Sequence, residues 1–410
     1  MTALLALALA ALLPLGTAHL LAVLLLRGAP PAGEERARRL VSFRLAAFFV
    51  GFAQIQIAWM AGARAAGAAG STASVVAGAL AAAVAFLVGG VGRRVEDPPA
   101  DPSTVLGTLV LRARMLPWFG GTAAAAALCA ALPVVAADGA VRWAWVALAL
   151  LVSGLGAAYG GIVASVLLGT LRPAGAAVRA IAEEAAAGEH VAVRFVLRLP
   201  TRGARFANAA AVPWARAMVV TDRIVELLTP EELRAVLAHE AGHLSEPLRV
   251  GAARLGSATL LLFTLTTGTR IAEAEGVQPL IAGGVAVVLA LGILAGVSRL
   301  ARGMEERADA RACATVGAAP LAEALRKLHA DGQMPMVTGA RRVHPDLYDR
   351  LVALGVDPGP RPAPPDRRRG LIVGLGLAAA IAFLGLQLIA LVAGNDDTGD
   401  DAATWTAAAR

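Results

Sequence analysis

Residues 234–247 read RAVLAHEAGHLSEP, a polar stretch in a chain of 410 residues that is 57% hydrophobic and only 16% charged. It places His239 and His243 four positions apart, so on a helix both imidazoles lie on one face. Two neutral imidazoles on one face can ligate one zinc ion. Glu240, turned away by about 100°, can serve as a base toward water instead of as a ligand. A solvated helix with two unrelated histidines is the alternative.

The residues around this stretch predict where its helix begins and ends. Thr229 and Glu232 have the spacing of a capping box, and Pro230 suits the first helical position. The helix is therefore expected to begin near residue 230, and Pro247 is expected to end it.

A catalytic zinc site needs a third protein ligand and an open position for water. The segment GMEERADARA, residues 303–312, offers Glu305 and Asp309 on one face of a predicted helix. Glu305 would complete a two-histidine, one-glutamate site, and Asp309 would accept a hydrogen bond from a ligand imidazole. Glu306 and Glu246 are alternative ligands, although Glu246 shares the histidines' helix, where closing a tetrahedron is awkward. A solvated helix with i,i+4 charge pairs is the other interpretation.

Apolar blocks occupy most of the remaining chain and favour a multi-pass α-helical membrane protein with about eight spans. Each block has roughly the 20 residues that a helix needs to cross the bilayer core. Arginines concentrate in alternate loops, which places those loops and the polar section after the fifth span on the cytoplasmic side. The predicted spans are 3–26, 41–62, 72–91, 116–137, 143–170, 252–269, 279–298 and 371–394.

Composition excludes several other classes of protein. The net charge of +7 comes from arginines at the ends of apolar blocks, and aromatics are only 4%, so membrane orientation explains the charge better than nucleic-acid binding. Cys129 and Cys313 lie far apart and predict no disulfide framework. The spans contain Arg44 but no paired acidic residues of the kind that proton-coupled transporters use.

Two motifs together resemble a known family. EELRAVLAHEAGH (231–243) followed by EERADARA (305–312) is similar to the membrane-embedded zinc metalloendopeptidases of the HtpX and CAAX prenyl protease type. That family pairs H-E-x-x-H with E-x-x-A-D. The upstream ANAAAVPWARAMVVTDRIVELLTPEEL (207–233) and the downstream HPDLYDRLVAL (344–354) also match its pattern.

The resemblance covers roughly residues 170–355 and leaves the first four spans uncovered. The chain departs from the family at Glu306, where an aromatic residue is common. It departs again after the second histidine, where LSEPLR (244–249) replaces a polar run ending in Asp.

This resemblance implies a role for each matching residue. His239, His243 and Glu305 are expected to ligate one zinc ion per chain, with Glu240 as general base and acid. Asn208 is expected near the strand that binds substrate.

The C-terminal motif implies two further catalytic residues. His344 and Arg350 are expected to approach the active site, where either could stabilise an oxyanion. An ordinary surface histidine and an arginine paired with Asp346 or Asp349 are the alternatives.

The resemblance and the spans together predict a cytoplasmic α+β zincin-like metalloprotease domain in a membrane protein. VAVRFVLRL (191–199) and RAMVVTD (216–222) are its predicted strands. The predicted organisation begins with an N-terminal transmembrane region of about five spans at 1–171. A zinc metalloprotease domain follows at 172–369, interrupted by a two-span hairpin at about 252–298. A C-terminal span at 370–394 and an acidic tail at 395–410 complete the chain.

The predicted function is zinc-dependent hydrolysis of peptide bonds in membrane or misfolded proteins, at the cytoplasmic face of the cell membrane. The expected partners are a protein or peptide substrate and the lipid bilayer, with no nucleic acid. Two alternatives remain: a signal-responsive sensor protease that cleaves one regulatory partner, and a non-catalytic membrane protein with a degenerate metal site.

Overall fold

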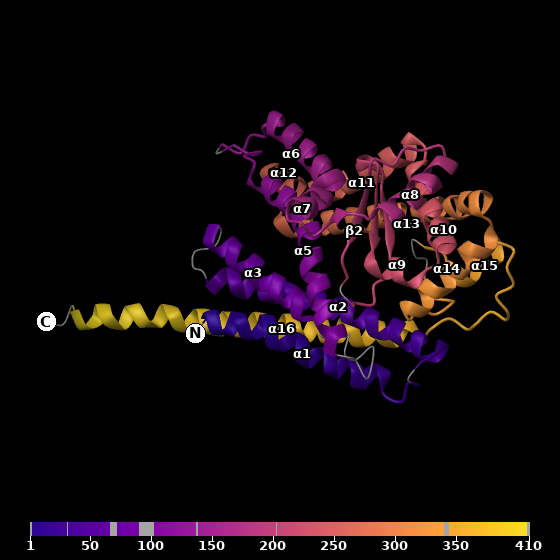
Figure 1. Ribbon diagram of the computed structural model, residues 1–410. Coiled ribbons are helices and arrows are strands. Elements are labelled where there is room, and N and C mark those ends of the chain that lie inside the picture. The colour runs from indigo at the N-terminus through magenta and orange to yellow at the C-terminus, as the bar shows by residue number, and fades with distance from the viewer. Residues whose placement is uncertain are drawn as a thin grey trace. The chain divides into compact units, whose positions relative to one another are not determined.

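The computed structural model describes residues 2–30, 32–65, 72–89, 102–136, 138–201, 203–339 and 344–407. The described chain is mostly helical, with one four-stranded sheet (Figure 1). It divides into two compact units. Unit 1 comprises residues 1–112, 333–338 and 363–410, and unit 2 comprises 113–332 and 339–362.

Unit 1 is a bundle of long apolar helices packed around α2. Its helices are α1 (Thr2–Leu26), α2 (Glu34–Ala65), α3 (Thr72–Val88), the first part of α5 (Pro102–Ala131) and α16 (Arg367–Ala407). Leu21, Leu40, Phe43, Ile57 and Ile381 are among the buried side chains that α1, α2 and α16 share as a core. Helix α2 therefore supplies the common face of the bundle.

Glycines let α16 approach α2 closely. A Cβ atom added to Gly374 would lie 2.7 Å from Ala46 Cα, and one added to Gly370 would collide with the Ser42 backbone. The two glycines are four residues apart, the small-xxx-small spacing that brings apolar helices into backbone contact in membranes. Dispersion between closely packed backbones therefore holds this pair of helices together.

Unit 2 contains a sheet with strand order β1-β2-β4-β3. The strands are β1 (Arg172–Pro173), β2 (Phe195–Leu199), β3 (Ala209–Val212) and β4 (Ala217–Thr221). β2 and β4 are parallel, whereas the other two pairs are antiparallel. Both predicted strands are confirmed as β2 and β4. The short strands β1 and β3 were not predicted, because neither shows an alternating pattern.

The helix that carries the histidines is α10 (Pro230–Leu244), as its flanking residues predict. The capping box is complete. Thr229 Oγ1 accepts a hydrogen bond from the Glu232 N–H at 3.3 Å, and Glu232 Oε2 accepts one from the Thr229 N–H at 2.8 Å. The other helices of the polar part are α8 (Ala176–Gly188), α9 (Asp222–Leu227), α14 (Ala318–Asp331) and α15 (Leu347–Ala353).

Apolar helices form the rest of unit 2, and π-helical turns interrupt two of them. The first is α6 (Trp143–Leu155), η2 (Gly156–Gly160) and α7 (Gly161–Leu167); the second is α11 (Leu248–Phe263), η4 (Thr264–Gly268) and α12 (Thr269–Ala274). By contrast, α13 (Pro279–Val316) is one continuous helix of 38 residues. Its first half is the predicted seventh span, and its second half carries Glu305 and Asp309.

Five helices of the described residues are long and apolar enough to cross a membrane: Glu34–Ala65, Trp143–Leu167, Leu248–Ala274, Ile281–Val316 and Arg367–Ala390. They match five of the eight predicted spans. Two more predicted spans contain the shorter apolar helices Leu12–Leu26 and Ala77–Val88. The span predicted at 116–137 falls in α5, which ends at Ala131 and is not among the five. The count of eight spans therefore stays a prediction.

The compact units do not follow the predicted domain ranges. Helices α6 and α7, predicted as part of the N-terminal transmembrane region at 1–171, belong to the same unit as the sheet. The C-terminal span belongs to the unit of α1 and α2. The predicted ranges follow hydropathy along the chain, whereas the units follow packing.

Candidate metal centre

Helix α10 carries His239, Glu240 and His243 on a buried segment. His239 is 6% exposed and Glu240 is 8% exposed. Gly242, between the histidines, faces α13: a Cβ atom there would lie 3.0 Å from Ala308 Cα. The glycine therefore lets the two helices approach until side chains from both can meet.

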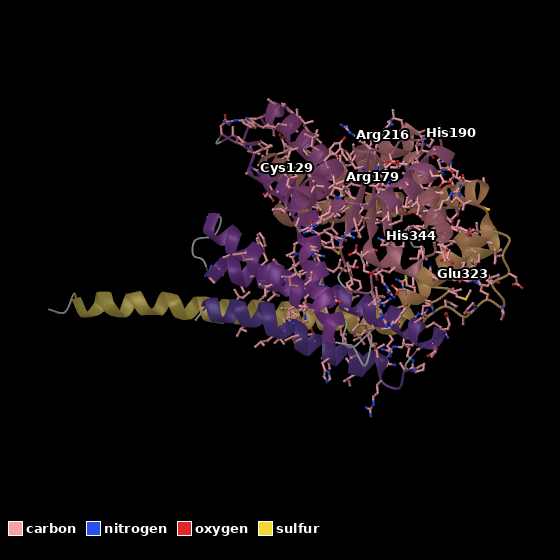
Figure 2. The ribbon with its side chains drawn as sticks, in the orientation of Figure 1. Cys129, Arg179, His190, Arg216, Glu323 and His344 are labelled. Atoms are coloured by element: carbon pink, nitrogen blue, oxygen red, sulfur yellow. The ribbon has the colours of Figure 1, made fainter. Side chains whose placement is uncertain are left out.

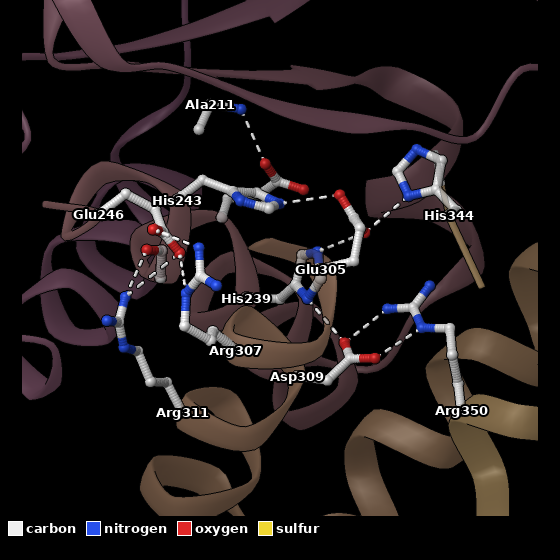
Figure 3. Close-up of polar contacts among 12 residues, drawn as sticks. Ala211, His239, His243, Glu246, Glu305, Arg307, Asp309, Arg311, His344 and Arg350 are labelled. Atoms are coloured by element: carbon white, nitrogen blue, oxygen red, sulfur yellow. Dashed lines mark hydrogen bonds and ion pairs between the residues drawn. The ribbon is translucent and has the colours of Figure 1, made fainter. Parts of the chain in front are cut away.

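Glu305 of α13 lies directly against the two imidazoles (Figure 3). Its Oε2 is 3.4 Å from His239 Nε2, and its Oε1 is 3.2 Å from His243 Nε2. One ligand atom from each of these residues lies within 4.8 Å of the others. Two imidazole nitrogens and one carboxylate oxygen are a donor set that catalytic zinc sites use, so the residues present fit this metal.

The alternative ligands lie elsewhere. Glu306 is exposed, although it is adjacent to Glu305. The side chain of Glu246 is only 3% exposed, but Arg307 Nη2 approaches its Oε2 at 2.8 Å and Arg311 Nη1 lies 3.9 Å from its Oε1. Both arginines follow Glu305 on α13. Glu246 lies just past the end of α10, pairs with these arginines and is not directed at the histidines (Figure 3).

Asp309 connects the metal centre to α15. Its Oδ1 lies 2.8 Å from His239 Nδ1, which leaves His239 Nε2 to face Glu305. Arg350 binds the same carboxylate through two nitrogens, Nε to Oδ2 at 2.7 Å and Nη2 to Oδ1 at 2.6 Å. Such a bidentate pair fixes both the position and the plane of the carboxylate.

Arg350 therefore has a partner that was not among the predicted alternatives. Asp346 and Asp349 instead lie near Arg361, whose Nη1 is 2.6 Å from Asp349 Oδ1 and whose Nη2 is 4.0 Å from Asp346 Oδ2. The guanidinium of Arg350 lines the site cavity, and its described hydrogen bonds go to Asp309.

The charges around His239 control its protonation. Burial alone disfavours the imidazolium, but hydrogen bonds to Asp309 and Glu305 outweigh burial and raise the pKa of His239 to about 9. Burial likewise disfavours the charge on Arg350, and Asp309 outweighs it, so the pKa of Arg350 is raised. Because a metal ligand must be a neutral imidazole, metal binding here would displace a proton.

Glu240 lines the same cavity as the three candidate ligands and contacts the edge strand of the sheet. Its Oε2 accepts a hydrogen bond from the Ala211 N–H at 2.7 Å (Figure 3). Ala211 belongs to β3, the edge strand, so its N–H is directed away from the neighbouring strand β4. The carboxylate thus lies between the histidines and the open edge of the sheet.

A cavity of about 320 Å³ opens above these residues. Asn208 and the β3 alanines line one side, and Val236, Met304 and three leucines of α14 form an apolar side. The backbone of Asn208 is held by Thr221, whose Oγ1 accepts its N–H at 2.9 Å. The structure therefore places Asn208 at the cavity wall, beside β3.

His344, labelled in Figure 2, lines the cavity, and its side chain is 66% exposed. Its Nδ1 is 2.6 Å from Glu305 Oε2. The ring is therefore within reach of both the proposed metal ligand Glu305 and the cavity.

Sequence reasoning missed two residues beside the site. Arg311 Nη1 donates to the Gly242 carbonyl at 2.9 Å and to Ser245 Oγ at 2.6 Å, and so ties the end of α10 to α13. Arg254, on α11, lines the cavity. Its place as a cation at the start of an apolar helix was the one signal that could have indicated it.

Part of the chain matches a known protease family. Residues 176–355 match the model of Peptidase family M48. The predicted resemblance to the HtpX and CAAX prenyl protease type is confirmed by this domain and by the relatives that follow.

The chain is also similar in sequence to several proteases and in fold to a solved structure. The chain is 30% identical over 187 residues to protease HtpX of Chromohalobacter salexigens, covering 37% of this chain and 62% of that protein. Protease HtpX of Pseudomonas putida is 29% identical over 181 residues, covering 36% of this chain and 61% of its own. The chain thus spans about three fifths of these relatives. Its fold is similar to that of S. mikatae Ste24p, with a TM-score of 0.51 and 15% sequence identity. The match covers 85% of this chain and 98% of the Ste24p chain.

Proposed function

We propose that this chain is a zinc-dependent endopeptidase that hydrolyses peptide bonds of membrane or misfolded proteins. The observation that carries the proposal is the convergence of His239, His243 and Glu305 within 4.8 Å of one another, beside the buried carboxylate of Glu240. The match to Peptidase family M48 over the segment that contains all four residues supports it.

The chain's own residues have distinct proposed roles. His239, His243 and Glu305 would hold one zinc ion, which when bound supplies a Lewis acid for peptide hydrolysis. Glu240 takes a proton from the attacking water and delivers it to the leaving amine. Its hydrogen bond from Ala211 holds its carboxylate between the metal ligands and the edge strand.

Asp309 and Arg350 act on the ligands. Asp309 fixes the tautomer of His239 by facing its Nδ1, so that Nε2 is free to ligate. Arg350 orients Asp309 and compensates its buried charge, which makes it a positioning residue. His344, exposed at the cavity mouth, is the proposed donor to the oxyanion.

The open edge of β3 supports an extended peptide as substrate. Backbone groups of an edge strand bind another chain by strand addition, which fixes a peptide without requiring one sequence. Asn208 and the β3 alanines line the same cavity as the metal ligands. A peptide that pairs with β3 therefore passes beside Glu240.

We place this site at the cytoplasmic face of the cell membrane. Five helices suited to span a membrane support a multi-pass protein in contact with the bilayer. The arginines concentrated in alternate loops support the cytoplasmic side, through the positive-inside rule.

Replacing Glu240 tests the proposal. Glu240→Gln in the full chain, purified in detergent, should still bind about one zinc per chain, since the glutamine oxygen can accept the Ala211 N–H. Casein cleavage should fall by at least about 100-fold, the usual loss on removal of a general base. Glu231→Gln, an exposed position on the same helix, is the control and should remain active. Retained cleavage by Glu240→Gln would contradict the proposal.

A further inference from the structure

A second cavity of about 380 Å³ adjoins the cavity of the metal centre. Ala211 and Arg254 line both cavities. Because the Ala211 N–H also binds Glu240, the junction between the cavities lies beside the proposed general base.

The second cavity is apolar and is built from the helices suited to span a membrane. Its walls come from the η2–α7 segment, α11 and α13, and include Ala158, Ile162, Leu261 and Ile293. The π-helical turn η2 contributes Ala157 and Ala158, and such turns are frequent at functional sites. Arg254 is the one charged residue in the lining.

The end of β3 leads from one cavity to the other. Asn208 to Ala211 line the first cavity, and Ala211 to Trp214 line the second. Trp214 is held by two apolar helices: its carbonyl accepts a hydrogen bond from Tyr159 Oη at 3.3 Å, and its ring lies 3.6 Å from where a Gly251 Cβ would be. A peptide paired along β3 would therefore place residues on one side of the cleaved bond at the apolar cavity.

Arg254 carries an uncompensated charge at this junction. It lies in the apolar helix Leu248–Ala274 and is exposed. In the part of the chain that the structure describes, it makes no ion pair or side-chain hydrogen bond, in contrast to Arg307 and Arg311 on α13. A cation within an apolar helix is costly, and such residues often face a cavity and mark the path of a substrate or ion.

We propose that Arg254 is a specificity-determining residue that binds a carboxylate side chain of the peptide substrate. The carboxylate flanks an apolar residue, which enters the second cavity. This proposal rests on the proposed function and names a class of peptide for the same site: an apolar residue beside an acidic one, next to the cleaved bond.

Peptide binding tests the proposal without requiring hydrolysis. Full-length Glu240→Gln protein, loaded with zinc in detergent, is titrated with fluorescein-labelled Ala/Ser/Gly peptides that carry Leu-Glu, Leu-Gln or Leu-Lys at the centre, and with the reversed pairs. For one of the two orders of the central residue pair, the peptide with Glu should bind about tenfold more tightly than the peptide with Gln. This is the gain expected for a hydrogen bond to a charged group. The preference should weaken as salt is raised.

Charge reversal at Arg254 gives the sharper readout. Adding Arg254→Gln should equalise the Glu and Gln peptides, and Arg254→Glu should favour the Lys peptide. Arg249→Gln is the matched control, since Arg249 is exposed on the same helix and lines neither cavity. A loss of overall folding would not reverse the order of the peptides, so reversal is specific to the proposed contact.

Equal affinities for the three peptides, including no binding at all, would overturn the role of Arg254, as would a Glu preference that survives Arg254→Gln. Failure of the wild-type chain to cleave casein is a separate result: it contradicts the proposed function but leaves a measured charge preference intact.

Discussion

Two pairs of helices in this protein use the same backbone device for opposite purposes. In unit 1, Gly374 brings α16 against Ala46 of α2, and in unit 2, Gly242 brings α10 against Ala308 of α13. The α2–α16 contact is flanked by apolar core residues, whereas the α10–α13 contact is flanked by buried imidazoles and carboxylates. In both cases a glycine lets two helices come close. The side chains around the contact then decide whether it forms an apolar core or brings metal-binding groups together.

The difference also shows what buried charge requires. In unit 2, Glu305 and Asp309 are 4% and 6% exposed, and each lies against an imidazole. Isolated buried carboxylates are strongly disfavoured, so the partners on α10 and α15 are a condition for this site to fold. Unit 1 needs no such compensation at its glycine contact.

The largest expected effect comes from removing the carboxylate that faces both histidines. Glu305→Gln should weaken zinc binding by more than about 100-fold, because its neutral amide is a poor replacement for a ligand anion. Metal content by mass spectrometry and competition with a chelator measure this. Glu306→Gln is the matched control, since Glu306 is the next residue and is exposed. Equal zinc affinity in the two variants would remove Glu305 from the ligand set.

Breaking the Asp309–Arg350 pair should lower stability. Arg350→Met leaves the Asp309 carboxylate buried beside His239 without its guanidinium, and removal of one partner of a buried pair costs about 3 kcal/mol. Zinc affinity should fall about tenfold as Asp309 loses its orientation. Thermal unfolding in detergent and zinc competition report the two effects. Arg361→Met, which breaks an exposed pair with Asp349, should change neither.

Adding a methyl group at each glycine contact separates packing from chemistry. Gly242→Ala and Gly374→Ala should each lower the free energy of unfolding by about 1–3 kcal/mol, because the new Cβ meets backbone atoms at 3.0 Å and 2.7 Å respectively. Only Gly242→Ala should also weaken zinc binding. Gly376→Ala meets nothing within 4 Å and should be neutral or stabilise α16. Weaker zinc binding in Gly374→Ala would contradict the view that the α2–α16 contact serves packing alone.

The smallest expected effect depends on pH and concerns the start of α10. Burial favours the neutral form of Glu232, but hydrogen bonds from Lys327 and the Thr229 N–H outweigh it and hold the pKa of Glu232 below its usual value of 4.5. Because the folded-state pKa is lowered, this stabilisation is present above the unfolded pKa and is lost as pH falls through the folded one.

Lys327→Gln tests this contribution. It should lower stability by about 0.5–1 kcal/mol near neutral pH and by less at acidic pH. Unfolding midpoints recorded between pH 7 and pH 3 would show the two curves converging. Arg326→Gln, whose nearest Glu323 oxygen is 3.9 Å away on an exposed surface, should follow the wild-type curve.

Local signals predicted part of this structure well. The capping box and Pro247 fixed the bounds of α10, and hydropathy located the five helices that can cross a membrane. The i,i+4 spacing placed His239 and His243 together, since helical periodicity alone brings them to one face. The choice between Glu305 and Glu306 depended on the family resemblance, and the structure directs Glu305 to the histidines.

Long-range pairing was not predictable in the same way. Arg350 was weighed against Asp346 and Asp349, its neighbours along the chain, yet it binds Asp309, 41 positions away. β3 has the sequence AAAV, which lacks alternation, and it forms by pairing with β4. Arg254 lines two cavities whose walls come from segments far apart in the chain, which no local pattern indicates.

The uninterrupted course of α13 would limit where the proposed protease can cut its substrates. The predicted span ends near Ser298, and Glu305 follows seven residues later on the same continuous helix. At 1.5 Å per residue, the Glu305 carboxylate would lie roughly 10 Å beyond the hydrocarbon boundary once the span is embedded. If the proposed function holds, a membrane-anchored target would be cut at headgroup depth, close to the point where it emerges from the lipid.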